Sequence, residues 1–345
     1  MIRITVRQII SRWGILFILL GAASLASAGE DSFGLEEYAA AWKHYARVVS
    51  GRFQIHGAFR QFGPAGAVFS REASYNITIS GTRIRFEVDA EHLITGDEGQ
   101  LAMLSGPDQA DRIGESLSSG SLRKERQRLL YVETEAQNYL YLDDGRQLQI
   151  KTNPRSAKSA VEFFDPRTLG LAGAPRPETV ANKSIEIISS AIQSLSGRNA
   201  IRVEFLNKDS VRTIVWLDEE SRLVTRIEGA APLAQANTVT EIEYRLDPAS
   251  SILVQQMATT RNYEGTRLIS ERVWTVAKSE INMPIDPEEF IPERFHMARN
   301  TTVFDDSNQR LVALWNGEAF VRPGKPDLDP ATMDFIHGST TKPAQ

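Results

Sequence analysis

The sequence predicts a mainly β protein of the α+β class, with a curved antiparallel sheet, or unclosed β-barrel, wrapped around helices and a small C-terminal β-hairpin. Three observations predict this fold. Residues 83–89 alternate strictly between apolar and charged side chains. Six strand-like segments follow one another between residues 200 and 277, separated by turn residues. Residues 35–49 carry an apolar stripe at helical spacing.

The chain has 345 residues, of which 41% are hydrophobic and 24% charged, as in an ordinary folded protein. Its net charge of -5 argues against a nucleic-acid-binding surface. It has no cysteine, which excludes disulfides, thiolate metal sites and cysteine nucleophiles. Stability must therefore come from a hydrophobic core.

The N-terminus has the pattern of a secretory signal peptide at residues 1–28. Three arginines precede the short apolar run 15–20, and Ala26-Ser27-Ala28 fits a signal-peptidase site, so the mature chain is expected to begin at Gly29. An uncleaved N-terminal anchor is the alternative. We expect a periplasmic or secreted protein without an integral membrane span once the signal is removed.

The opening helix is predicted at 35–49, with Gly51 as its stop. Strands are expected at 52–62, 67–79 and 83–89. Residues 91–128 are polar and glycine-rich, and we expect a long excursion there. Strands at 129–133 and 139–151 follow, the second folded into a hairpin about Asp144-Gly145.

Residues 152–197 form a proline-rich crossover that is expected to contain a second helix at 182–195, stopped by Gly197. A β-meander then extends to residue 277. A last hairpin turns at Asn316-Gly317. The predicted organisation is a signal peptide at 1–28, a half-barrel domain at 29–298, a terminal hairpin at 299–322 and a disordered tail at 323–345.

This order of elements resembles the bacterial outer-membrane lipoprotein-carrier superfamily (LolA/LolB-like). The resemblance covers roughly residues 35–290. It depends on the opening helix, the strand-turn-strand segment Val215–Gly229 and the closing segment Ile285–Phe290. It implies an unclosed barrel around a helical lid that holds acyl chains. In that family an arginine on an early strand supports the lid, and Arg71 and Arg85 both match its place.

Motifs for catalysis are absent or isolated. The sequence has no G-x-S-x-G, no H-E-x-x-H and no dinucleotide-binding glycines. Ser121-Leu-Arg-Lys124 matches S-x-x-K, but no companion motif accompanies it. None of the five histidines lies three or four residues from another, so no local metal pair exists. We expect neither an enzyme nor a cofactor or metal; a hydrolase with a scattered site is the minor alternative.

Large apolar side chains are the candidate ligand site. Five lie on predicted strands and would line the concave side of the sheet, and one lies on the opening helix opposite them. Ordinary core packing is the alternative role. The candidate ligand-binding residues are Trp42, Phe86, Trp216, Tyr244, Met257 and Trp274.

The function expected from these observations is non-enzymatic binding of an apolar ligand outside the cytoplasm. The ligand would be an acyl chain, a lipid or a lipoprotein anchor held between sheet and helices. The alternative is a cell-envelope scaffold or protein-interaction module with a fully packed barrel, whose partner would be another envelope protein.

Overall fold

A computed structural model describes residues 34–63, 66–95, 122–143, 146–152, 165–231, 236–308, 310–324 and 327–338. The expected signal peptide, the Asp144-Gly145 turn and Ser121 of the S-x-x-K match therefore lie outside the described residues. Within the described part, no helix combines the length and the apolar composition needed to cross a bilayer.

The predicted fold class is confirmed, because the chain is mainly β. Its sheet is unclosed, because the first and last strands of the strand order do not pair with each other. Sixteen strands pair in the order β16-β15-β14-β6-β5-β4-β3-β2-β1-β13-β12-β11-β10-β9-β8-β7. The pairing of β14 with β6 is parallel and so departs from the antiparallel pattern of the described pairings on either side of it. The chain forms two compact units, and their boundaries differ from those of the predicted half-barrel domain.

The smaller unit comprises residues up to Tyr45 and Gly173–Thr240. Its core lies between the helix at 34–45 and the four strands that follow α4. Tyr38 and Ala41 are fully buried on the helix, and the Tyr38 ring lies 4.9 Å from that of Phe205. The elements are α4 (Pro177–Ala181), β7 (Ile185–Leu195), β8 (Arg198–Asn207), β9 (Arg212–Asp218) and β10 (Val224–Ala231).

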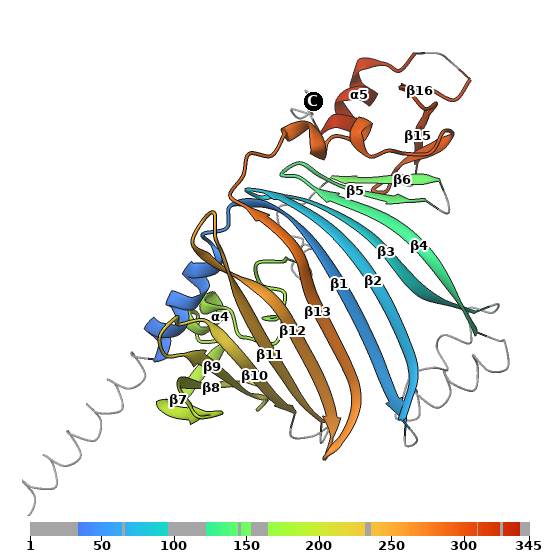
Figure 1. The fold of residues 1–345 in the computed structure, drawn as a ribbon. Coiled ribbons are helices and arrows are strands. Elements are labelled where there is room, and N and C mark those ends of the chain that lie inside the picture. Colours follow the sequence, from blue (N-terminus) through green and yellow to red (C-terminus); the bar gives the residue numbers. More distant parts are fainter. Residues whose placement is uncertain are drawn as a thin grey trace, which may run out of the picture. The chain divides into compact units, whose positions relative to one another are not determined.

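The larger unit comprises Ala46–Ala172 and Glu241–Gln345, and β11 (Ala236–Asp247) is divided between the two units. Its long strands curve along their length (Figure 1). The strands are β1 (Ser50–Gly63), β2 (Gly66–Ser80), β3 (Arg83–Thr95), β4 (Leu122–Glu133), β5 (Gln137–Leu142), β6 (Gln147–Thr152), β12 (Ile252–Glu264), β13 (Arg267–Ile281), β14 (Thr301–Asp305), β15 (Arg310–Trp315) and β16 (Phe320–Val321). The helical elements are η2 (Pro287–Phe290), η3 (Pro292–Arg294) and α5 (Pro330–His337).

The predicted second helix at 182–195 is wrong, because this segment is strand β7. Its β-branched isoleucines favour an extended chain. Pairing with β8 supplies the backbone hydrogen bonds that a helix would otherwise make internally. Ser196 and Gly197, both at positive φ, form the two-residue turn of the β7–β8 hairpin, so Gly197 ends a strand rather than a helix.

The opening helix is shorter than predicted and ends at residue 45 rather than 49. Asn282 explains the early end. Its side-chain nitrogen donates to the Arg47 carbonyl at 3.0 Å, and its Oδ1 accepts from the Val49 backbone nitrogen at 2.9 Å. These bonds replace helical ones, and Val49 is 58% exposed instead of continuing the apolar stripe.

The expected excursion at 91–128 is also shorter than predicted. Residues 91–95 continue β3 and residues 122–128 begin β4, and the two segments pair across from each other. The prediction interpreted the mostly polar side chains of these segments as those of a loop. A strand that is mostly polar on both faces lacks the alternation of apolar and polar residues by which strands are recognised in a sequence. The predicted strands of the meander are confirmed as β8–β13.

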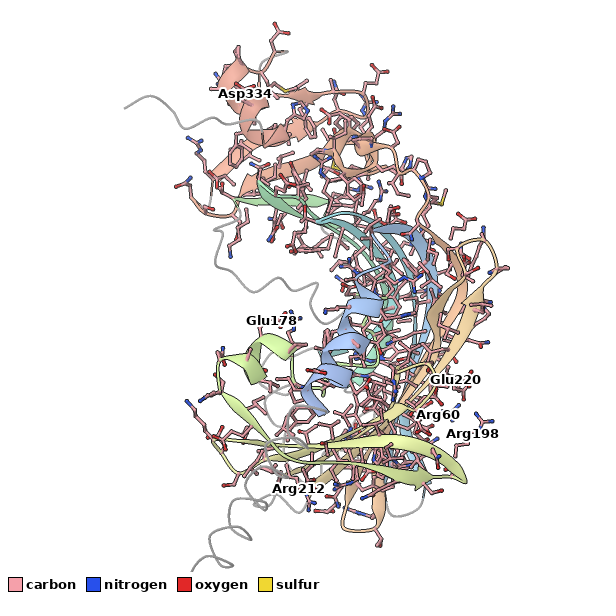
Figure 2. All side chains as sticks on the ribbon, turned by 90° about the vertical axis from the view of Figure 1, so that its left-hand side faces the viewer. Arg60, Glu178, Arg198, Arg212, Glu220 and Asp334 are labelled. Atoms are coloured by element: carbon pink, nitrogen blue, oxygen red, sulfur yellow. The ribbon has the colours of Figure 1, made fainter. Side chains whose placement is uncertain are left out.

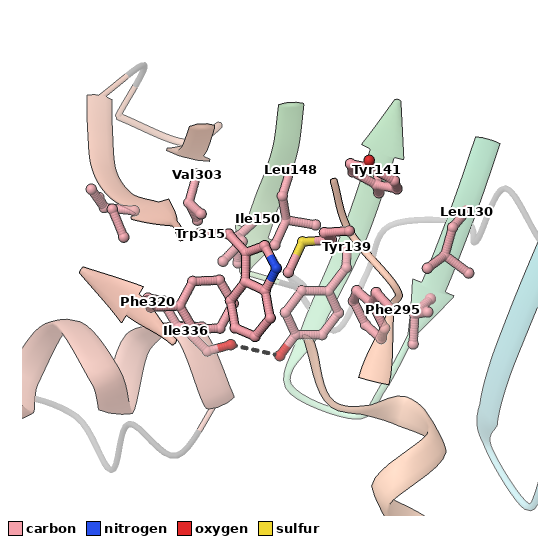
Figure 3. Packing of buried hydrophobic residues seen from close by; sticks show 14 of the residues in the cluster. Leu130, Tyr139, Tyr141, Leu148, Ile150, Phe295, Val303, Trp315, Phe320 and Ile336 are labelled. Carbon is pink, nitrogen blue, oxygen red and sulfur yellow. Dashed lines mark hydrogen bonds between the residues drawn. The ribbon is translucent and has the colours of Figure 1, made fainter. Parts of the chain in front are cut away.

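The C-terminal segment covers one end of the sheet in the larger unit. The hairpin about Asn316-Gly317 is confirmed by the pairing of β15 with β16. The expected disorder of 323–345 is wrong for 330–337, which form α5. Ile336 of α5 is fully buried, and Tyr139 Oη donates to its carbonyl at 3.0 Å (Figure 3). Asp329 caps the helix and a left-handed Gly338 ends it.

Candidate functional site

Four aromatic side chains from four strands of the larger unit share one face of its sheet, which we call the aromatic face. The strand register places Phe59, Tyr75, Phe86 and Trp274 on this side. The Tyr75 ring lies 5.4 Å from Phe86 and 5.2 Å from Trp274. Phe86 and Trp274 are only 7% and 9% exposed, whereas Phe59 and Tyr75 are half-buried. Phe86, Tyr75 and Trp274 therefore form a row of neighbouring rings on β3, β2 and β13, and Phe59 of β1 lies on the same side of the sheet.

Gly57 on β1 makes room for this row. A Cβ atom at this position would lie 2.6 Å from Cζ3 of Trp274 and 3.2 Å from Cε2 of Tyr75. The distance to Trp274 is too short for a real contact and that to Tyr75 is tight, so a side chain at this position would force the Trp274 ring to move. A glycine in the interior of a strand lowers the stability of that strand. Here the packing of the Trp274 and Tyr75 rings across β1 offsets that loss.

A small cavity of about 80 Å³ lies at one end of the row. Two exposed arginines border it. The Arg71 guanidinium lies 5.4 Å from the centre of the Phe59 ring and that of Arg272 lies 5.7 Å from the same ring, while Arg272 is also 5.9 Å from Trp274. The lining residues are Gly57, Ala58, Phe59, Arg71, Ala73, Tyr75, Arg272 and Trp274.

The charged side chains that border this cavity are those of Arg71 and Arg272, and both are positive. Desolvation and the neighbouring Arg71 charge both lower the pKa of Arg272, and Tyr75 opposes them. Burial raises the pKa of Tyr75, so its hydroxyl stays neutral at physiological pH. An arginine remains protonated under such conditions. Within the described residues neither arginine makes an ion pair, so the two cations lie together without a counter-ion from that part of the chain.

The structure brings together only some of the candidate residues. Phe86 and Trp274 lie on the aromatic face. Tyr244 is half-buried on β11, two residues from the buried Ile242 and on the same side of that strand. Met257 pairs with Thr275, one position along from Trp274, and therefore lies on the opposite face of the sheet.

Trp42 and Trp216 both belong to the smaller unit, and they do not form opposing walls. Trp216 shares its sheet face with Arg202, whose guanidinium lies 5.8 Å from its ring, and its Nε1 donates to Glu228 at 3.1 Å. The opening helix packs through Tyr38 on the other face, against Phe205. Trp42 is half-buried on that helix, and its ring lies 6.4 Å from that of Tyr38.

Sequence reasoning missed Phe59, Tyr75, Arg272 and the role of Gly57. The sequence contains a signal for Gly57, because an isolated glycine inside a strand indicates that another group approaches the backbone closely at that position. The opposition of Gly57 to Trp274 and of Phe59 to Arg272 depends on pairing β1 with β13, which are more than 200 residues apart. No pattern of neighbouring residues in the sequence specifies the register between these two strands.

Arg71 and Arg85, the two matches for an arginine of the carrier family, lie on opposite faces of the sheet. Arg71 borders the cavity on the aromatic face. Arg85 lies beneath the segment that follows β13, where its Nη1 donates to the carbonyls of Glu289 at 2.8 Å and Arg294 at 3.2 Å. Its guanidinium also lies 5.7 Å from the Phe295 ring. Arg85 thus anchors the closing segment to β3.

A larger cavity of about 430 Å³ lies on the face opposite the aromatic face. Two of its acidic groups have basic partners: Asp89 binds Arg126 of the lining at 2.5 Å, and Glu87 binds Arg85, which lies outside the lining, at 2.5 Å. Tyr141 donates to Asp143 at 3.0 Å. Because these charges compensate each other, this cavity gives no preference for a ligand of one charge.

The fold and the aromatic face define a class of protein: an unclosed, mainly antiparallel β-sheet that presents an apolar face. No family model and no curated protein matches the chain. Among solved structures, the chain is similar to an outer membrane lipoprotein-sorting protein domain described as putative, from Vibrio parahaemolyticus. The identity is 10%, the match covers 75% of this chain and 97% of that one, and the TM-score is 0.40.

Two further structures are similar over the same extent. A DUF1329 family protein from Desulfovibrio piger matches at 7% identity, covering 76% of this chain and 98% of that one, with a TM-score of 0.43. A LolA superfamily protein from Nitrosomonas europaea matches at 10% identity, covering 76% and 97%, with a TM-score of 0.36.

Proposed function

We propose that this chain is an extracytoplasmic, non-enzymatic binding protein that holds an apolar ligand against the aromatic face. The ligand is an acyl chain, a lipid or the lipid anchor of a lipoprotein. The observation that carries the proposal is the row of rings from Phe86 through Tyr75 to Trp274, which ends at a cavity bordered by Tyr75 and Trp274. Rings that border a cavity offer contact area to a hydrocarbon chain at little conformational cost.

The test compares two substitutions on opposite faces of the same sheet. The purified protein is extracted for bound lipid and then titrated with a fluorescent fatty acid. Trp274→Ala removes the ring at the cavity end of the row and is expected to abolish uptake. Met257→Ala removes a large apolar side chain of the next strand on the other face and is expected to retain it. Loss of uptake in both variants would point to general unfolding, which a thermal melt detects.

The second candidate is a cell-envelope scaffold whose sheet is fully packed. It is favoured by the small volume of the cavity, about 80 Å³, which is well below that of usual ligand pockets. In that case wild type would carry no lipid and take up no probe. Trp274→Ala would then cost about 3–5 kcal/mol of stability, as expected for a tryptophan removed from a filled core.

The extracytoplasmic part of the proposal is tested at the N-terminus. The short apolar run before Ala26-Ser27-Ala28 predicts cleavage that leaves Gly29 first. Intact mass of the protein isolated from its native compartment measures this directly. A full-length chain recovered with the membrane fraction would instead show an N-terminal anchor.

A further inference from the structure

We propose that the ligand of the aromatic face carries an anionic group, which Arg71 and Arg272 receive together at the cavity. This inference rests on the proposed function and specifies its ligand: a single amphiphile with a carboxylate or phosphate at one end and an alkyl chain at the other. The two guanidinium groups bind the anionic group of this amphiphile, and the aromatic face contacts its alkyl chain.

The geometry supports a shared anion site. Both guanidinium groups lie within 6 Å of the same ring, that of Phe59, and both border the same cavity. Each group presents a fork of N–H donors that matches the oxygens of a carboxylate or phosphate. A volume of about 80 Å³ accommodates such a group but not a long chain. The alkyl chain must therefore continue outside the cavity, and the half-buried rings of Phe59 and Tyr75, which border the cavity, provide an apolar surface for it.

The charges indicate the sign of the ligand. Two like charges held close together repel each other, and the lowered pKa of Arg272 reflects desolvation together with the charge of Arg71. An anion between them would remove that repulsion. The other arginines near this end of the sheet already have acidic partners on the opposite face: Arg60 binds Glu271 at 3.6 Å, and Arg261 binds Glu271 at 3.0 Å. Arg71 and Arg272 thus differ from their neighbours in lacking such a partner among the described residues.

The experiment measures binding of three probes with the same alkyl chain: dodecanoate, dodecanol and dodecylammonium. Wild type is expected to bind dodecanoate at least about tenfold more tightly than dodecanol, and dodecylammonium most weakly. In the double variant Arg71→Gln/Arg272→Gln the preference for dodecanoate over dodecanol should fall to about one, with dodecanol binding unchanged. Arg60→Gln is the control on the opposite face of β1; it removes one positive charge where the double variant removes two, and it should keep the preference. Arg60 is labelled in Figure 2.

Added salt and inorganic phosphate distinguish the binding of an anionic amphiphile from the binding of a free anion. The preference for dodecanoate should weaken at high ionic strength, because the arginines are exposed. Inorganic phosphate should compete only at concentrations far above that of dodecanoate. If it competes equally well, the site binds a free anion and the role of the chain is overturned.

The outcomes for the two proposals are distinguishable. If wild type binds none of the probes, the proposed function fails. If it binds dodecanoate and dodecanol equally, and the arginine substitutions change neither, the anion site is overturned while the apolar site stands. Thermal melts of the variants should match wild type closely, because substitutions of exposed side chains usually change stability by less than about 0.5 kcal/mol.

Discussion

Arg85 on β3 donates from Nη1 to the backbone carbonyl of Glu289 at 2.8 Å, across 204 positions of sequence. The same nitrogen reaches the carbonyl of Arg294, and the opposite edge of the guanidinium binds Glu87. One side chain therefore ties the two short helices η2 and η3 to the sheet. It is buried although it belongs to the charged side of an alternating strand, because the closing segment covers it.

Replacing Arg85 by methionine is expected to destabilise the protein by about 1–3 kcal/mol, because it leaves two backbone carbonyls without their donor. Chemical denaturation measures the change. Arg83→Met is the control on the same strand and the same face, and it should be close to neutral because no such carbonyl bonds depend on Arg83 in the described part of the chain. Equal effects of the two substitutions would contradict an anchoring role.

Gly57→Ala is expected to cost about 1–3 kcal/mol, because the added methyl group would overlap the Trp274 ring and force it to move. Near-ultraviolet circular dichroism should report the displaced tryptophan, and a thermal melt the loss of stability. Gly229→Ala on β10 is the matched control, since nothing lies within 4 Å of the Cβ it would add. A variant at Gly57 as stable as that control would show that the rings are free to shift.

Ile336→Ala on α5 is expected to cost about 2–5 kcal/mol, because Ile336 is fully buried in the cluster shown in Figure 3. Deleting residues from 330 onward should cost at least as much, since it also removes the partner of the Tyr139 hydroxyl. Asp334→Ala, an exposed position on the same helix labelled in Figure 2, should be near neutral. An unchanged melting temperature after the deletion would make α5 dispensable.

Glu204 should make the stability of the protein sensitive to acid. Burial by itself raises the pKa of Glu204, but hydrogen bonds from Arg212 and Arg202 outweigh it and lower the pKa below its usual value. A carboxyl with a lowered folded-state pKa stabilises the fold fully above its unfolded-state pKa. That contribution is lost as the pH falls through the folded-state pKa.

The melting temperature of wild type should therefore fall more steeply below about pH 4 than that of Glu204→Gln, which cannot gain the proton. The two curves should be furthest apart near neutral pH and converge in acid. Glu178→Gln, at an exposed position labelled in Figure 2, is the control and should follow wild type throughout. Parallel curves for wild type and Glu204→Gln would show that this ion-pair network does not contribute to the pH dependence.

Local patterns were enough to predict most strands, but the errors share a cause. Residues 185–195 have isoleucines that suit a helix by spacing and a strand by β-branching, and pairing with β8 decides between them. The opening helix ends at residue 45 because Asn282, far away in sequence, captures the backbone of Arg47 and Val49. In α5 a short apolar segment forms a helix because Ile336 enters a core assembled from β4–β6 and β14–β16.

The sequence by itself determined the class of fold, since alternation and turn residues are properties of neighbouring positions. It also determined that large apolar side chains would lie on the sheet, and it identified Phe86 and Trp274 of the aromatic face. Only the tertiary structure decided which side chains meet there. Pairing β1 with β13 places Gly57 beneath Trp274 and Phe59 beside Arg272. The pairing of β12 with β13 places Met257 on the other face. A shift of one residue in that pairing would exchange the two faces, and local sequence does not specify the pairing of strands that lie far apart in the chain.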